Sequence, residues 1–138
     1  MAVTQALRNG INVLTLARAP VNSFNWELRR DLLAALKTSI ADNSVGAIVI
    51  TGGTRTFSAG ADIREFSAGL AGDMMKSPTL PDLVNAIERS PKPVVAAISG
   101  SCLGGGLEVA LGCHSRVTTA DARLALPEIG RASCRERV

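Results

Sequence analysis

The chain has 138 residues, which is enough for one modest domain and not for two. Hydrophobic residues make up 46% and aromatic residues only 3%, so a core built from Ala, Val, Ile and Leu is expected. The net charge is +3, but three arginines and one glutamate in the last eight residues supply +2 of it, and a nucleic-acid partner is therefore not expected. No apolar run approaches the ~20 residues of a membrane span, and the N-terminus lacks the layout of a secretory signal.

The first half of the chain predicts a strand, a helix and a second strand. Residues 11–16 alternate apolar and polar side chains, which is typical of a strand. Leucines and an isoleucine recur at every fourth position over 28–40 and predict an amphipathic helix, which Asn22 or Ser23 could cap. The apolar run 47–51 predicts a strand buried on both faces, and a loop is expected to follow it.

The second half continues the alternation of helices and strands. Helical spacing of apolar residues predicts a helix over 80–89, and residues 93–98 predict a second buried strand. A third helix is expected at 105–114, followed by short strands at 116–119 and 123–126. The pattern indicates an α/β fold with a mostly parallel sheet.

The three cysteines favour a reducing compartment. Cys102, Cys113 and Cys134 form no Cys-x-x-Cys pair and are odd in number, so neither a disulfide framework nor a metal site is expected. Cys113 next to His114 is interpreted as a small buried thiol rather than a nucleophile, because neighbouring residues point in different directions on a helix. His114 is expected at the end of the third helix, where it would interact with the helix dipole.

Two loops of small residues are candidates for backbone hydrogen-bond donors. Residues 104–106 are three glycines between a strand and a helix, where unpaired N–H groups suit a phosphate or a developing oxyanion. A tight turn is the alternative interpretation. Residues 58–62 form a second such loop after a buried strand, and both loops are expected to meet beyond the carboxyl ends of the strands.

Glu108 and Glu128 are the candidate acid/base residues. Glu108 lies one turn into the third helix, where an acidic residue also stabilises the helix dipole. Glu128 follows Pro127 and could equally be a solvated loop carboxylate. Two carboxylates near two donor loops would make a general acid/base pair over an oxyanion site.

At these residues the chain resembles the crotonase (enoyl-CoA hydratase/isomerase) superfamily. The likeness is greatest to the N-terminal region of the multifunctional fatty-acid β-oxidation enzymes. The matching segments, in family order, are Pro20–Asn22, Phe57–Arg64, Lys92–Ile98, Gly104–His114 and Leu126–Gly130. The resemblance implies an α/β crotonase-like (ClpP/crotonase) spiral of ββα units, of which residues 1–130 would be the N-terminal part. Residues 131–138 match nothing in the family and are interpreted as a truncation artefact.

The resemblance also implies roles for particular residues. The backbone N–H groups of Ala61 and Gly105 would form an oxyanion hole for the thioester enolate, each worth about 3–4 kcal/mol. The residues expected to line the CoA path are Ser58, Ala59, Gly60, Ala61, Asp62, Ile63, Gly104 and Gly105.

Family hydratases place two glutamates 20 positions apart around a catalytic water, and here 128 − 108 = 20. The resemblance thus implies that Glu108 helps to activate the water and that Glu128 exchanges a proton with the water and the α-carbon. The expected activity is enoyl-CoA hydration in fatty-acid β-oxidation. The alternatives are enoyl-CoA isomerisation at the same site, or a catalytically silent fragment that binds CoA.

The expected partner is an acyl-CoA substrate, with no metal and no cofactor; NAD would enter only through a dehydrogenase region in a longer parent. The parent family is usually oligomeric or multidomain. The expected compartment is a bacterial cytoplasm, or a peroxisome in a eukaryote.

Overall fold

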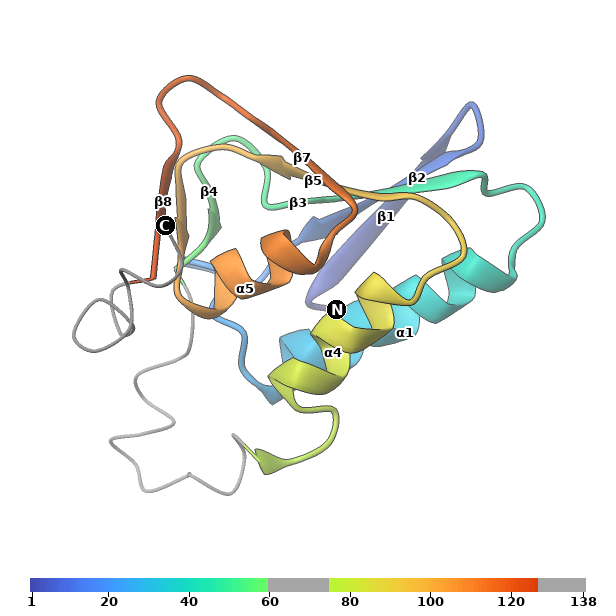
Figure 1. Ribbon diagram of the computed structural model, residues 1–138, viewed down its shortest axis with the longest axis horizontal. Coiled ribbons are helices and arrows are strands. Elements are labelled where there is room, and N and C mark those ends of the chain that lie inside the picture. The colour runs from blue at the N-terminus through green and yellow to red at the C-terminus, as the bar shows by residue number, and fades with distance from the viewer. Residues whose placement is uncertain (60–74, 127–138) are drawn as a thin grey trace.

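The computed structural model describes residues 1–59 and 75–126. This part of the chain contains two β-sheets and three helices (Figure 1). The strands are β1 (Val3–Arg8), β2 (Ile11–Leu16), β3 (Ala47–Thr51), β4 (Thr56–Ser58), β5 (Val94–Ile98), β6 (Ser101–Leu103), β7 (Ser115–Thr118) and β8 (Arg123–Ala125). The helices are α1 (Trp26–Ala41), α4 (Leu80–Glu88) and α5 (Gly105–Gly112). Among the residues described, no helix is long and apolar enough to cross a membrane.

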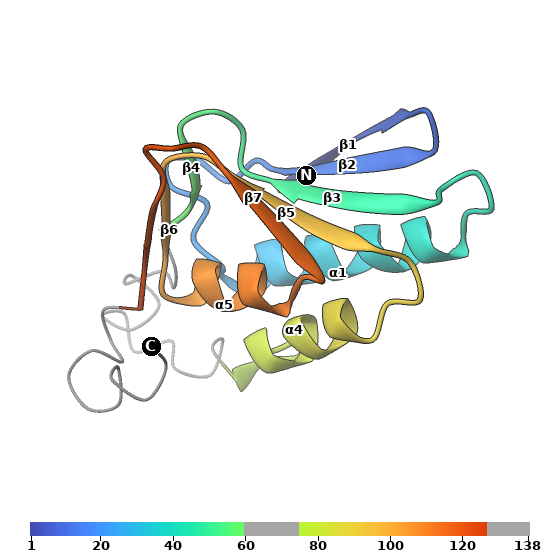
Figure 2. The same cartoon turned by 45° about the horizontal axis from the view of Figure 1, so that its top comes forward.

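The main sheet has the strand order β1-β2-β3-β5-β7. Only β1 and β2 pair antiparallel, and the other neighbours are parallel, as the alternation of strands and helices predicted. Figure 2 shows all three helices on one face of this sheet. A second sheet, β4-β6-β8, is wholly parallel and lies beside the N-terminal end of α5.

The central strands are fully buried on one face only, so the prediction of burial on both faces is wrong. In β3 and β5, residues alternate between buried and half-buried. Val94 and Ala96 are completely buried, whereas Val95 between them is half-buried. The reason is the layering: the helices pack against one face of the sheet, and in the part of the chain described here the opposite face has no helix against it (Figure 2).

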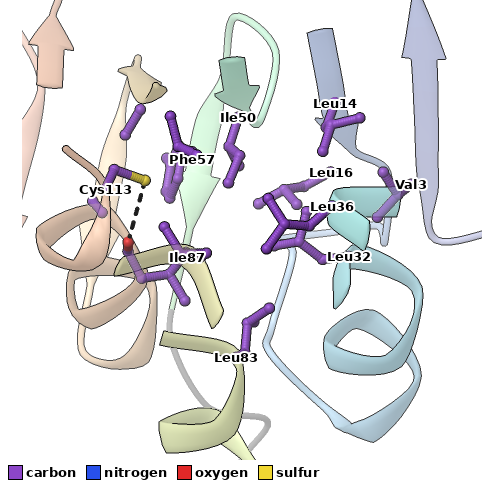
Figure 3. Close-up of a cluster of buried hydrophobic side chains, with 14 of the residues drawn as sticks. Val3, Leu14, Leu16, Leu32, Leu36, Ile50, Phe57, Leu83, Ile87 and Cys113 are labelled. Carbon is purple, nitrogen blue, oxygen red and sulfur yellow. Dashed lines mark hydrogen bonds between the residues drawn. The ribbon is translucent and has the colours of Figure 1, made fainter. Parts of the chain in front are cut away.

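Helix α1 confirms the four-residue periodicity but not the predicted cap. Leu28, Leu32 and Leu36 are completely buried, and Figure 3 shows Leu32 and Leu36 facing side chains from the main sheet. The helix is capped by Asn25, whose side-chain oxygen accepts a hydrogen bond of 2.9 Å from the N–H of Leu28. Asn22 is buried in another role, described below, which explains why the predicted capping by Asn22 or Ser23 is wrong.

Three strands were not predicted: β1, β4 and β6. The core is also less purely aliphatic than expected, because Phe24 and Phe57 are buried with the Leu, Ile and Val side chains. Phe57 lies on β4 and contributes to the cluster in Figure 3, which ties the small sheet to the main core.

Candidate active site

The end of β4 is fixed by the turn that precedes α1. Ser58 is completely buried, and its hydroxyl donates a 2.7 Å hydrogen bond to the carbonyl oxygen of Asn22. The Asn22 side chain in turn donates to the carbonyl of Phe57 at 3.1 Å, and the N–H of Ala59 donates to the carbonyl of Val21 at 2.9 Å. These reciprocal bonds hold the start of the first candidate donor loop in one position.

The second candidate loop joins β6 to α5 through Gly104. This residue has φ 52° and ψ −121°, a backbone conformation that favours glycine. Its carbonyl accepts from the N–H of Glu108 at 3.0 Å, in the first turn of α5. The N–H groups of Gly105, Gly106 and Leu107 therefore lie at the helix N-terminus, where helical geometry provides no intrahelical acceptor for them. This is the donor arrangement expected from the glycine run.

The end of β4 and the first turn of α5 are in direct contact. A Cβ atom on Gly106 would lie 2.6 Å from the Cβ of Ser58 and 2.7 Å from its Oγ. No real pair of side chains tolerates such a separation, so glycine at 106 is what permits α5 to approach the end of β4. The parallel pairing of β4 with β6 brings the C-terminal ends of both strands to the same side of the small sheet.

Glu108 lines a cavity of about 400 Å³ between α4 and α5. The other lining residues are Pro81, Val84, Asn85, Glu88, Leu111, Gly112 and Leu126. Glu108 is half-buried, and most of the remaining surface is apolar except for Asn85 and Glu88. A carboxylate at the edge of an apolar cavity, one turn from helix N–H groups that have no intrahelical acceptor, is suited to proton transfer next to a developing oxyanion.

The structure therefore brings together Ser58, Ala59, Gly104, Gly105 and Glu108 at the junction of the small sheet and α5. The remaining predicted site residues, which are Gly60, Ala61, Asp62, Ile63 and Glu128, lie outside the described residues.

Sequence reasoning did not single out Asn85 and Glu88. Both are polar residues that share the face of α4 with Pro81 and Val84, at spacings of three and four residues. That spacing is visible in the sequence, but nothing in the sequence indicated that this face would turn toward α5.

His114 directly follows the C-cap of α5, at the helix end where it was predicted, and its side chain contacts two other elements. Its Nδ1 accepts a 3.0 Å hydrogen bond from the N–H of Val94. Nε2 lies 3.2 Å from the carbonyl oxygen of Glu88 at the end of α4. His114 thus connects the end of α4 to the start of β5.

Cys113 is buried, as predicted, and so is Cys102. Burial raises the pKa of each thiol to about 12, which is inconsistent with a nucleophilic thiolate at neutral pH. The part of the chain that the structure describes holds no cluster of three or more metal-ligating side chains.

Comparison with known proteins identifies the family. The family model for enoyl-CoA hydratase/isomerase matches residues 6–131. The human peroxisomal bifunctional enzyme is 45% identical over 129 residues, which cover 94% of this chain and 17% of that protein. A Bacillus subtilis (strain 168) protein named "Probable enoyl-CoA hydratase" is 39% identical over 130 residues, which cover 93% of this chain and 50% of the relative.

The fold comparison agrees. The crystal structure of enoyl-CoA hydratase from Bacillus anthracis superimposes with a TM-score of 0.85 at 27% identity, covering 96% of this chain and 53% of the other. The prediction of an α/β crotonase-like fold is confirmed. This chain is a member of the enoyl-CoA hydratase/isomerase family.

Proposed function

We propose that this chain hydrates trans-2-enoyl-CoA thioesters to 3-hydroxyacyl-CoA. The observation that carries the proposal is the contact between Ser58 and Gly106, which places the N-terminal N–H groups of α5 beside the end of β4 and one turn before Glu108. The chain spans 17% of the human relative and half of the Bacillus subtilis relative, so the reaction is proposed for this chain and not transferred from them.

In the proposed reaction, Glu108 accepts a hydrogen bond from a water molecule and so helps to activate it, while Glu128 takes one proton of that water and the water oxygen bonds to the β-carbon of the substrate. The electron pair of the double bond moves toward the thioester carbonyl, and the N–H of Gly105 stabilises the oxygen as it becomes negative. A proton then returns to the α-carbon. We assign that return to Glu128 and the second oxyanion donor to Ala61, both on the family resemblance.

Hydration leaves the overall oxidation state of the substrate unchanged, because the elements of water are added to one double bond. We therefore propose a reaction that uses the acyl-CoA as substrate and no redox cofactor. The apolar lining of the Glu108 cavity supports an acyl group as its occupant, since an apolar surface binds hydrocarbon favourably.

The test is a Glu108→Gln variant assayed with crotonyl-CoA, following loss of the conjugated thioester absorbance. We expect the rate to fall by about 10²- to 10⁴-fold, the usual contribution of a general acid/base. Glu27→Gln is the matched control, because Glu27 is an exposed glutamate in the first turn of α1. A wild-type chain without turnover, or a Glu108→Gln variant of unchanged rate, would contradict the proposal.

The family description also names isomerases, so double-bond isomerisation is the second candidate. One carboxylate suffices to move a proton between carbons, whereas hydration also requires an activated water. If Glu108→Gln abolishes hydration of crotonyl-CoA but leaves conversion of a trans-3-enoyl-CoA intact, Glu128 alone supports isomerisation. If neither substrate reacts with the wild type but CoA still binds, the chain is a silent CoA-binding fragment.

A further inference from the structure

We propose that Arg29 is a positioning residue for the acyl group of the substrate: it holds the start of α4, and so the wall of the cavity that faces Glu108. The inference rests on the proposed function, because it assigns the cavity to an acyl chain. It predicts that Arg29 governs selectivity for acyl-chain length without contacting the substrate.

Arg29 is a buried cation that holds backbone carbonyls. Its side chain is in the first turns of α1 and only 1% exposed. Nε donates a 2.8 Å hydrogen bond to the carbonyl of Pro78, and a terminal nitrogen lies 3.5 Å from the carbonyl of Lys76. The other terminal nitrogen donates to the carbonyl of Phe24 at 2.9 Å. The guanidinium therefore joins the start of α1 to the segment that leads into α4.

Trp26 completes this attachment. Its indole N–H donates a 2.8 Å hydrogen bond to the carbonyl of Ser77, between the two carbonyls that Arg29 contacts. The Lys76 ammonium lies 4.0 Å from the centre of the Trp26 ring, within range of a cation–π interaction. Three consecutive carbonyls, those of residues 76–78, are thus held by two side chains of α1, and we call this arrangement the α1 clamp.

The α1 clamp connects directly to α4. Thr79 caps the helix, its hydroxyl accepting from the N–H of Asp82 while the Asp82 carboxylate accepts from the N–H of Thr79 at 2.9 Å. The same carboxylate accepts from the Ser77 hydroxyl at 3.3 Å. With the clamp holding residues 76–78 and the cap holding 79–82, the position of the first turn of α4 is determined by α1.

The face of α4 that carries Pro81 and Val84 forms one wall of the cavity. Pro81 and Val84 lie across the cavity from Glu108 and Leu111 of α5. The helices are closely packed here, because a Cβ atom on Gly112 would lie 2.9 Å from Cγ1 of Val84. A displacement of the first turn of α4 would therefore change the width of the cavity.

Arginine suits this role better than lysine. The planar guanidinium presents five N–H donors in a fixed fork, so one side chain can reach carbonyls of two different segments at once. A lysine ammonium offers three donors from a single nitrogen and cannot span the same set.

The experiment compares Arg29→Met with Arg30→Met in the full 138-residue chain. Arg30 is the adjacent residue and also lies over the Trp26 ring, at 4.8 Å, but its guanidinium pairs with Asp31 at 2.9 Å. Kinetics are measured with 2-enoyl-CoAs of four, eight and twelve carbons. Backbone amide hydrogen exchange of residues 80–88 is measured on the same samples, since it requires no turnover.

For Arg29→Met we expect exchange over 80–88 to accelerate by about tenfold, and KM for the longer substrates to rise by about tenfold with kcat for crotonyl-CoA nearly unchanged. Arg30→Met should show neither change. The emission of Trp26, the only tryptophan, should shift to longer wavelength in Arg29→Met as the α1 clamp opens.

Two results for Arg29→Met would overturn the inference. One is an unchanged rate of amide hydrogen exchange over residues 80–88. The other is a loss of kcat that is equal for every chain length and is explained by the loss of thermal stability. The second result would mean that Arg29 has a purely structural role. A wild-type chain with no turnover on any of the three thioesters contradicts the proposed function instead, and also removes the assignment of the cavity to an acyl chain. The exchange result still decides in that case whether Arg29 holds α4.

Discussion

At the scale of single residues, the site depends on one close approach. Gly106 faces Ser58 at a distance where an added Cβ would be 2.6 Å from the serine Cβ. Neither partner can move freely, because the Ser58 hydroxyl is bonded to the Asn22 carbonyl and Gly106 belongs to the first turn of α5. The close approach of α5 to the end of β4 therefore requires that residue 106 has no Cβ atom.

We predict that Gly106→Ala lowers the free energy of unfolding by about 1–3 kcal/mol, the usual cost of overpacking, and also slows hydration. Urea denaturation and the crotonyl-CoA assay measure the two effects. Gly46→Ala is the control, because the nearest atom to a Cβ there is the carbonyl oxygen of Gly10 at an ordinary 3.7 Å.

A double-mutant cycle tests the cause. Ser58→Gly removes the atoms that a Cβ at 106 would meet first, so the penalty of Gly106→Ala should be smaller in that background. Equal penalties in both backgrounds would show that the Ser58 contact is not the reason for glycine at this position.

At the scale of elements, the periodicity of apolar residues predicted those helices and strands whose pattern lies within their own sequence. The helices at 28–40 and 80–89 and the strands at 11–16 and 47–51 appear close to their expected bounds, because each has its own apolar pattern. The strands β4 and β6 have only three residues each and no such pattern. They form because Thr56 pairs with Ser101, 45 residues later, and no local window contains that partner.

The same distinction applies to the candidate site. The positions of Gly105 and Glu108 in the first turn of α5 were predictable, because a glycine run between a strand and a helix is a local signal. The cavity could not be predicted, because it depends on how α4 packs against α5. That packing makes Asn85 and Glu88 line the same cavity as Glu108. The α1 clamp could not be predicted from the sequence either, because Arg29 and Pro78 are 49 residues apart.

Asn25, and not Asn22 or Ser23, caps α1. Asn25→Ala removes the acceptor for the N–H of Leu28, so we expect the free energy of unfolding to fall by about 1 kcal/mol. Ser23→Ala, at a position that the sequence also favoured, should change it by less than about 0.5 kcal/mol. Urea denaturation at neutral pH compares the two; a larger effect at Ser23 would contradict the assignment of Asn25 as the cap.

At the scale of the whole molecule, the site lies where three layers meet. The main sheet supports α4 and α5 on one face, and the small sheet lies at the N-terminal end of α5. His114 joins the end of α4 to β5, and Lys92 donates to the carbonyls of Ser39 and Asp42 at the end of α1. The C-terminal ends of α1 and α4 are thus bonded to the segment at the start of β5 or to the residue that follows α5, so the position of α4 relative to α5 depends on the sheet as well as on the two helices.

The buried thiols predict how the stability of that fold depends on pH. Burial raises the pKa of Cys102 and Cys113 from an ordinary value of 9.0 to about 12. Between these values the folded chain keeps protons that the unfolded chain has lost. The stabilisation is therefore complete below pH 9 and decreases as the pH rises toward 12, by up to ~1.4 kcal/mol per pH unit for each thiol.

Urea denaturation under reducing conditions at pH 8.0, about 9.5 and about 10.5 measures this slope, with the pH values chosen to span the shift between the two thiol states. Replacing Cys102 and Cys113 together by Ala should flatten the slope. Lysines titrate in both proteins, so the difference between them isolates the thiols, and the sequence has no tyrosine to add a phenol in the same range. If the wild type and the double variant lose stability equally above pH 9, the two thiols do not ionise on unfolding as their burial requires.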